Sequence, residues 1–436
     1  MNVLFIKFGI GFIIAFLSFF SFLKTKAKLG IWLLIIILPV YSIKFLGEAG
    51  DIFTIEFSDI LLAAIVFPLV LREILLSKKN GKTISSKIVG LFFIFIIYFL
   101  LASLTIFWTK DSFLTLREMF IIAVFGFLFF TPLITVSHWN EKDLRLSLFL
   151  VILTGVMIAL LGICQVFFPE YAIIRSVQPG FPTGTFTETN WYVNLLILTG
   201  CWSLFALKSQ RKSLIILSAV SLPLFLIGIY LAKSMTGLIG FIYLFLLFFI
   251  YFLTKRPLVC TFFIFIFLIS ILIFPSYFAG FVEPFREISA FFQGEISGNM
   301  EIRSVQLMTS LQLIKNNPWG YGAGTWEPVM KEVTEWELGP FGWINGILLE
   351  QGILAFLAWL IFIISCVIII IKSYILTQRW EIKAALFSFI WLLIAGFPHP
   401  MYYMNFFWFY MGFSVAVIFP ILKNHFQNKH ETKTNL

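Results

Sequence analysis

The amino-acid sequence predicts an all-α integral membrane protein. Of its 436 residues, 60% are hydrophobic and only 12% are charged, whereas soluble domains carry about 25% charged residues. A membrane-spanning helix needs about 20 consecutive apolar residues, and dividing the chain on that basis predicts about 12–14 transmembrane helices, with thirteen apolar runs in all. These runs are centred near residues 13, 37, 66, 98, 126, 157, 199, 223, 245, 267, 357, 391 and 414.

The distribution of charge predicts how the chain is oriented. Its net charge is +9, which taken alone would suit a nucleic-acid-binding protein. When alternate loops are assigned to opposite sides, one set carries about two thirds of the 31 Lys and Arg residues, and the other carries most of the 22 Asp and Glu residues. Because positive residues collect in cytoplasmic loops, the basic set is predicted to be cytoplasmic, and no nucleic-acid partner is expected.

This orientation predicts four parts of the chain. Residues 1–275 hold the first ten transmembrane helices, beginning with a retained span that has no small-residue cleavage site after it. Residues 276–340 form one long extracytoplasmic loop containing short helices, which caps the bundle. Residues 341–422 hold the last three transmembrane helices, and residues 423–436 form a cytoplasmic tail.

The sequence shows no pattern that would hold a metal ion or a cofactor, and none is expected. All four cysteines lie inside apolar runs, so neither a disulfide framework nor a CxxC metal motif is predicted. They are Cys164, Cys201, Cys260 and Cys366.

Shorter outward loops carry polar residues that suit a binding site. The loop at residues 169–190 is rich in Pro and Gly, and irregular backbone at membrane depth is tolerated only where protein or a water-filled cavity surrounds it. Arg175 is the one cation of this loop, and Glu188 and Asn190 stand just before the next span. Lys233 lies in a very short outward hairpin. Both cations also fit as anchors that reach the lipid head groups, so that interpretation stays open.

The long loop contains a predicted amphipathic helix between Met300 and Lys315. Asn299 can cap its start and Pro318 ends it. Its apolar face consists of Val305, Met308 and Leu311. Its polar face consists of Arg303, Gln306 and Ser310. Such a helix is expected to lie over the mouth of the membrane bundle, with Arg303 directed inward.

A glycine-rich turn at Trp319–Gly324 follows this helix. Glycine allows the backbone to approach a ligand closely, but the turn lacks the Gly-Lys-Ser/Thr ending of a phosphate-binding P-loop. Arg286 is a further cation of the long loop. The sequence therefore predicts that the long loop contributes several groups to one outward-facing site.

Ionisable residues near the ends of spans are costly and often functional. Glu350 lies one or two turns inside a predicted span, and His399 lies between two prolines in the last outward loop. A hydrogen-bonded structural histidine is the alternative for His399. Arg117 and Glu118 stand where another span begins, and a local ion pair explains them as well as a function does.

Four stretches, taken together in order and spacing across residues 150–420, resemble the O-antigen ligase and polysaccharide polymerase superfamily of membrane glycosyltransferases. They are Gly184–Asn190, Ser234–Gly237, the Arg303 helix followed by Pro318–Gly324, and Glu350–Ile353. Ligases of this family carry His-Asn just before the Glu-x-Gly element. At those positions this sequence has Phe341 and Gly342, and the nearest asparagine is Asn345.

The resemblance implies a metal-independent transfer of glycan from an undecaprenyl-diphosphate carrier to a sugar hydroxyl, at the outer face of the bacterial inner membrane. It implies that outward cations hold the diphosphate, with Asn190 and Asn345 as further substrate contacts. The cations are Arg175, Arg303, Lys233 and Arg286. The implied partners are an undecaprenyl-diphosphate-linked glycan, an acceptor glycolipid, membrane lipids and a protein that regulates chain length.

General chemistry agrees with this reading. Breaking a sugar–diphosphate bond builds negative charge on the leaving group, and Arg can bind phosphate oxygens with two parallel hydrogen bonds. The attacking hydroxyl needs a base, for which His399, Glu350 and Glu188 are the candidates. The sequence therefore favours a polysaccharide polymerase, with a ligase that attaches finished polysaccharide as the close alternative. A transporter or flippase for the lipid-linked sugar is the alternative from another class, although no matching halves are found.

Overall fold

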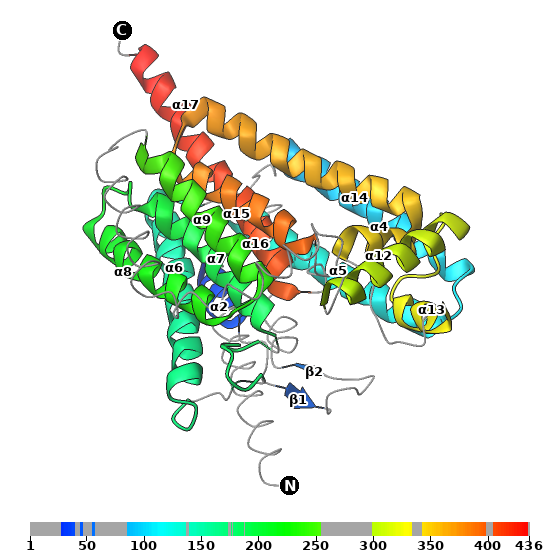
Figure 1. The fold of residues 1–436 in the computed structure, drawn as a ribbon. Coiled ribbons are helices and arrows are strands. Elements are labelled where there is room, and N and C mark those ends of the chain that lie inside the picture. The colour runs from blue at the N-terminus through cyan, green and yellow to red at the C-terminus, as the bar shows by residue number, and fades with distance from the viewer. Residues whose placement is uncertain are drawn as a thin grey trace. The chain divides into compact units, whose positions relative to one another are not determined.

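The computed structural model describes residues 28–39, 44–46, 55–56, 85–136, 139–172, 176, 178–186, 188–253, 299–333, 342–397 and 404–434. Within these ranges the chain is almost entirely helical (Figure 1). The exceptions to an all-α fold are two short strands, β1 (Lys44–Leu46) and β2 (Ile55–Glu56), which pair antiparallel. The spans predicted near residues 13, 66 and 267 lie outside the described residues.

Six helical segments among the described residues are long and apolar enough to cross a membrane. They are α4 (Ser86–Ser103) with its continuation η1 (Leu104–Phe107), α5 (Ser112–Val136), α6 (Glu141–Phe167), α8 (Lys212–Leu231), α14 (Gly342–Thr377), and α16 (Asn405–Ala416) with the start of α17 (Ile418–Thr434). The remaining helices are α2 (Lys28–Ile37), α7 (Thr189–Ala206), α9 (Met235–Leu253), α12 (Asn299–Asn316), α13 (Trp326–Val333) and α15 (Trp380–Gly396). The chain is therefore a helical membrane protein, and the count of thirteen spans stays a prediction.

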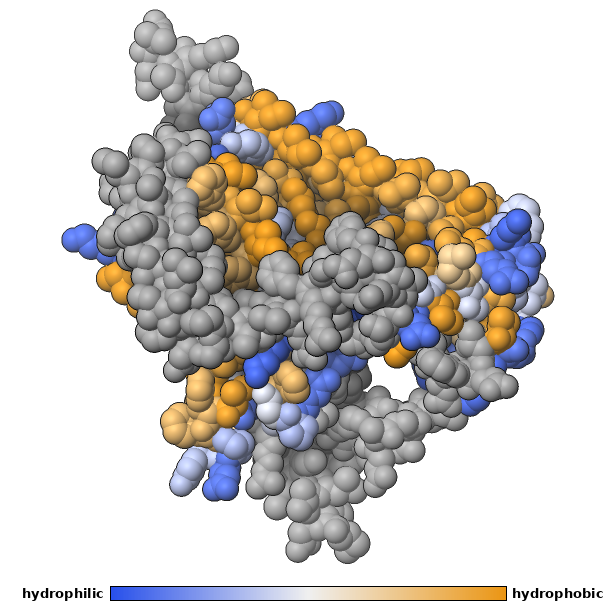
Figure 2. Space-filling view, in the orientation of Figure 1, coloured by the Kyte–Doolittle hydropathy of each residue, from blue (hydrophilic) through white to orange (hydrophobic). Residues whose placement is uncertain are grey.

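The exposed side of α14 shows why this helix belongs in a membrane. A continuous row of large apolar side chains along it is exposed, and Figure 2 shows the corresponding apolar band. The row consists of Ile353, Leu354, Leu357, Ile361, Ile364, Ile368, Ile371 and Ile375. A contiguous apolar surface of this length marks contact with lipid or protein rather than with water.

The chain divides into two compact units. Unit 1 comprises Met1–Leu34, Ser58–Leu146 and Gly298–Leu436, and its core is aromatic. The ring of Phe362 on α14 lies 4.8 Å from that of Phe129 on α5 and 5.7 Å from that of Phe95 on α4. Trp408 of α16 stacks on Phe125 at 5.9 Å. Edge-to-face and offset aromatic pairs at these distances add to the stability that burial alone provides.

Helix α16 is the most enclosed element of unit 1. In the span that it begins, Asn405–Gln427, 94% of the most apolar window is buried inside the protein. Gly412 lies against the backbone of α5, where an added Cβ would stand only 2.1 Å from the carbonyl oxygen of Phe129. Close approach of helix backbones at a small residue is the usual packing mode of membrane helices.

Unit 2 comprises Ile35–Phe57 and Ser147–Ser297, and its described helices pack around Tyr192 of α7. The ring of Tyr192 is fully buried, and three glycines leave the space that it occupies. They are Gly162 of α6, Gly184 of the following loop and Gly228 of α8.

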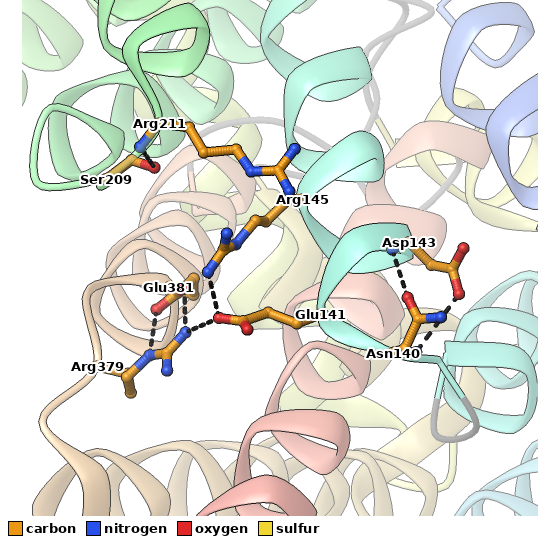
Figure 3. Close-up of polar contacts among 8 residues, drawn as sticks. All are labelled: Asn140, Glu141, Asp143, Arg145, Ser209, Arg211, Arg379 and Glu381. Atoms are coloured by element: carbon orange, nitrogen blue, oxygen red, sulfur yellow. Dashed lines mark hydrogen bonds and ion pairs between the residues drawn. The ribbon is translucent and has the colours of Figure 1, made fainter.

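A network of charged and polar side chains joins the start of α6 to the start of α15 within unit 1 (Figure 3). Arg379 bonds Glu381 at 2.7 Å and Glu141 at 3.1 Å, and Glu141 also pairs with Arg145. The Glu381 carboxylate, which is 2% exposed, raises the pKa of Arg379 above its usual value through their hydrogen bonds. Because both helix starts lie in loops that the charge distribution assigns to the cytoplasm, this network belongs to the end of unit 1 that is predicted to face inward.

The turn before α6 carries its own helix cap. The amide of Asp143 donates to the side-chain oxygen of Asn140 at 2.9 Å, and the amide of Asn140 donates to the Asp143 carboxylate at 3.4 Å. This reciprocal arrangement satisfies backbone donors that the first turn of a helix leaves without partners. Figure 3 also shows Arg211, whose amide donates to the hydroxyl of Ser209 in unit 2.

Candidate active site

Helix α14 is broken at Gly352, and the break organises the candidate site. Gly352 has φ 80° and ψ 174°, which no helix allows. The ring of Trp343 lies 4.1 Å from that of Trp359, although a continuous helix would separate these residues by about 24 Å. The chain therefore reverses at Gly352, and Gly342–Gln351, here called the short arm, folds back against the long arm, Ile353–Thr377.

The glycine-rich turn supplies the hydrogen bonds that the break leaves open. The amides of Tyr321 and Gly322 donate to the carbonyls of Leu349 and Glu350, both at 2.9 Å, at the end of the short arm. At the start of the long arm, the amide of Ile353 donates to the carbonyl of Pro318 at 2.9 Å. Helix ends carry backbone groups without intrahelical partners. The turn thus caps both arms at once.

Gly320 and Gly352 make this close approach possible. A Cβ on Gly320 would stand 2.6 Å from the amide nitrogen of Gly352, and a Cβ on Gly352 would stand 2.2 Å from the carbonyl oxygen of Trp319. Both residues have φ near +80° to +90°, a region that L side chains rarely adopt. The glycine pattern predicted a close backbone approach to a ligand, whereas the approach seen in the structure is to the protein's own broken helix.

Helix η1 and the loop that follows it hold the other side of the turn. Trp108 donates its indole N–H to the carbonyl of Gly320 at 2.9 Å, and the amide of Ala323 donates to the hydroxyl of Thr105 at 3.3 Å. Neither Trp108 nor Thr105 was predicted as a site residue. The one signal for Trp108 in the sequence was its place in a loop between two apolar runs. Its contact with Gly320 could not be deduced, because the two residues are 212 positions apart.

Glu118 of α5 lies directly against the turn. Glu118 is 2% exposed, and a Cβ added to Gly324 would stand 2.9 Å from the Cβ of Glu118. One of its carboxylate oxygens is buried without a hydrogen-bond partner among the described residues, and Gln351, at the end of the short arm, is 2% exposed. Arg117, by contrast, is exposed. The turn therefore covers buried polar groups at the end of the short arm.

Glu350, predicted as a candidate base, is fully buried. Its Oε1 accepts a hydrogen bond from the amide of Trp326 at 3.3 Å, and its carbonyl accepts from Gly322. These contacts give Glu350 a part in positioning the turn and the first residue of α13. Asn345, in the middle of the short arm, is 8% exposed.

The predicted helix carrying Arg303 is present as α12, which begins at Asn299 and ends at Asn316. Its inward side is centred on Ser310, which is buried, and includes Leu313. Arg303 is partly buried on that side. The apolar residues Val305, Met308 and Leu311 are exposed instead. The side of α12 that carries Ser310, Leu313 and Arg303 therefore packs on the protein, and the role of Arg303 stays a prediction.

Three predicted site residues belong to unit 2. Glu188 is the N-cap residue of α7, and Asn190 lies in its first turn. Lys233 is exposed and has φ 48° in the turn that joins α8 to α9. The loop before α7 is irregular, as predicted, and the buried side chain of Gln165 holds it by accepting from the amides of Thr183 and Gly184 at 2.9 and 2.7 Å.

Arg175, Arg286 and His399 lie outside the described residues. For His399, however, the neighbouring chain is described. Phe397 lies against the N-terminus of the short arm. A Cβ added to Gly342 would stand 1.7 Å from the Phe397 carbonyl oxygen. The structure thus brings Glu350, Asn345, Arg303 and the start of the last loop into unit 1.

Comparison with known families gives a match that covers these elements of unit 1. Residues 219–360 match the family described as O-Antigen ligase, a range that includes α12, the glycine-rich turn and the short arm. The match covers about a third of the chain and confirms the resemblance to the O-antigen ligase and polymerase superfamily. It supports a glycosyltransferase-like membrane enzyme of ligase or polymerase type. No curated protein matches the chain.

Proposed function

We propose that this chain, with its match to the O-antigen ligase family, is a polysaccharide polymerase of the bacterial inner membrane. It transfers a glycan from an undecaprenyl-diphosphate carrier to a sugar hydroxyl at the periplasmic face. The observation that carries the proposal is the junction of α12, the glycine-rich turn and the short arm. These elements lie within the matched residues and form one hydrogen-bonded structure at the end of unit 1 opposite the Arg379 network.

The cations of the site are proposed to hold the diphosphate. Arg303 is the cation on the inward side of α12, and it points away from the exposed apolar side. Preorganised positive charge at a leaving group typically contributes more to catalysis than any other single effect. Asn345 of the short arm is proposed to contact the sugar, and the roles that the resemblance implies for Arg175, Lys233, Arg286 and Asn190 stay predictions.

His399 is proposed as the base that takes the proton of the attacking hydroxyl. The supporting observation is the contact between Phe397 and Gly342. Gly342 occupies a position where ligases of the family carry their His-Asn pair, and Phe397, which precedes His399 by two residues, lies against it. Glu188 is the alternative base. Glu350 is proposed to position the turn, because its carboxylate bonds a backbone amide.

The proposed step balances without a cofactor. The hydroxyl oxygen of the acceptor attacks the anomeric carbon, the bond from that carbon to the diphosphate breaks, and its electron pair leaves with the diphosphate. The hydroxyl proton goes to the base. The arginine-bound diphosphate is a better leaving group because its added charge is neutralised.

A ligase remains a second candidate, because the matching family is described as O-Antigen ligase. The two activities differ only in the acceptor, which is another lipid-linked repeat for a polymerase and a lipid A core or another acceptor for a ligase. The acceptor preference of the purified protein distinguishes these two activities.

The deciding experiment supplies the purified full chain, in detergent, with an undecaprenyl-diphosphate-linked repeat alone or together with a lipid A core acceptor. A ladder of longer lipid-linked glycans from the repeat alone supports the polymerase. Glycan that appears only on the core acceptor assigns a ligase. Unchanged glycan length in detergent, with passage of the lipid across vesicles that contain the protein, would assign a transporter and overturn the enzyme.

A further inference from the structure

The exposed side of α12 carries three large apolar residues in the middle of the helix, with Gln312 beside them. Val305, Met308 and Leu311 follow one another at helical spacing, and Met308 is 68% exposed. Charged residues stand only near the two ends of this side, at Glu301 and Lys315. An exposed apolar row on a helix whose opposite side already packs on the protein indicates a second apolar environment.

The surroundings of this row identify that environment. Helix α12 packs against α14 (Figure 1), and its last turn leads to Pro318, whose carbonyl accepts from the amide of Ile353. Ile353 begins the exposed apolar row of the long arm. The apolar side of α12 therefore ends where the membrane-facing side of α14 begins.

Exposed tryptophans stand at the same level. Trp319, directly after α12, is 58% exposed, and its backbone lies against Gly352 at the start of the long arm. Trp108, at the end of the α4–η1 span, is also exposed and bonds the neighbouring residue Gly320. Tryptophan is enriched where a membrane's hydrocarbon meets its head groups, so these two residues mark that boundary.

We infer that α12 lies in the membrane–water interface, with Val305, Met308 and Leu311 in contact with the acyl chains of the lipid layer. Helices that lie in this interface are typically buried about 5–10 Å into the boundary between head groups and acyl chains. Its long axis then lies along the membrane surface, which lets Glu301 and Lys315 reach the head groups while the middle of the row contacts lipid.

This placement sets the depth of Arg303. Successive residues of a helix are about 100° apart, so Arg303 points almost opposite to Val305. If the proposed function holds, Arg303 meets the diphosphate of its donor at the depth where lipid phosphates already lie. The donor then needs no lifting out of the membrane to reach this arginine.

The test uses lipid nanodiscs and no substrate, so its outcome does not depend on the reaction. Val305→Cys, Met308→Cys and Leu311→Cys are each labelled with an environment-sensitive fluorophore in a chain whose native cysteines are replaced. Glu327→Cys, on the exposed side of α13, is the control. Lipids with a quencher near the head group should quench the three α12 positions strongly and leave position 327 unaffected.

Two results would overturn the inference. In the first, a charged, membrane-impermeant thiol reagent reacts with the three α12 positions as fast as with position 327, which means that they face water. In the second, the α12 labels are shielded but not quenched by lipid, and the shielding depends on protein concentration, which assigns the surface to a second copy of the chain.

A parallel measurement keeps the native cysteines. A photo-reactive amino acid at position 308 should form adducts with lipid, whereas the same amino acid at position 327 should form none. Protein adducts at 308 without lipid adducts would also overturn the inference.

Discussion

Gly320 and Gly352 lie so close together that a Cβ on Gly320 would stand 2.6 Å from the amide nitrogen of Gly352. This contact joins two segments that the chain separates by α13 and the short arm. It holds the glycine-rich turn on the break of α14, and with it the end of α12. The stability of the candidate site should therefore depend on the absence of side chains at these two positions.

Replacing Gly352 with alanine should destabilise unit 1 by about 2–4 kcal/mol, because it adds backbone strain of about 1–3 kcal/mol to a clash with the Trp319 carbonyl. Thermal unfolding of the detergent-solubilised protein measures the loss. Two controls separate the causes. Gly180→Ala has φ 82° but open space around it, and Gly90→Ala, in helix α4, has open space and helical backbone. Equal unfolding temperatures for all three variants would contradict the proposed packing.

Trp108→Phe should lower the free energy of unfolding by about 1 kcal/mol, the usual net value of a hydrogen bond. The substitution removes the indole donor that bonds Gly320 while keeping an aromatic ring. Trp319→Phe is the matched control, because Trp319 is exposed and the turn uses only its backbone. Chemical denaturation compared across both variants checks the difference, and a larger effect at Trp319 would refute the assigned roles.

Arg303→Ala should reduce glycan transfer by about a hundredfold or more, the typical effect of losing a preorganised group that stabilises developing charge. Membrane insertion, measured by the yield of solubilised protein, should be retained. Lys315→Ala removes an exposed cation from the same helix and should leave transfer near the wild-type rate. Wild-type activity in Arg303→Ala would remove this arginine from the site.

His399→Ala should lower the transfer rate by about a hundredfold, as expected for the loss of a general base. The pH dependence of the residual activity should lose the limb that reports the histidine. His425→Ala, a histidine of α17 whose ring contacts Phe426, is the control and should behave as wild type. A fully active His399→Ala variant would return the base to Glu188.

The Arg379 network predicts a ranking of two substitutions. Glu141→Gln should change stability by less than about 1 kcal/mol, because Glu141 is 42% exposed and exposed ion pairs contribute little. Arg379→Gln should cost more, about 1–3 kcal/mol, since it leaves the buried carboxylate of Glu381 without its charged partner. Thermal unfolding of both variants checks the order, and a reversed order would show that Glu381 is stabilised by other groups.

Much of the fold was predictable because membrane helices are written locally. Apolar runs predicted the positions of α4, α5, α6 and α8. Asn299 predicted the start of α12, and Pro318 predicted its end to within two residues. These signals act over a few positions of the chain, so a single sequence contains them. The β1–β2 pair was not predicted, because strands of two or three residues carry no periodicity.

The break of α14 shows what could not be predicted. Its 36 residues read as one apolar stretch, and a glycine within it is common in membrane helices. The backbone angles of Gly352 and the contact of Trp343 with Trp359 reveal that the chain turns back. Glu350 illustrates the same limit at the site, because its acidic side chain in an apolar run indicated function. Its hydrogen bond to the amide of Trp326, 24 positions away, could not be deduced from spacing.

Helix α16 is made last among the helices that pack at the centre of unit 1, yet α5, its neighbour at Gly412, is made early. During translation α5 must wait in the bilayer or beside an insertion factor until α16 has left the ribosome. The centre of unit 1 is therefore completed only when α16 fills the space that the helices made before it have left.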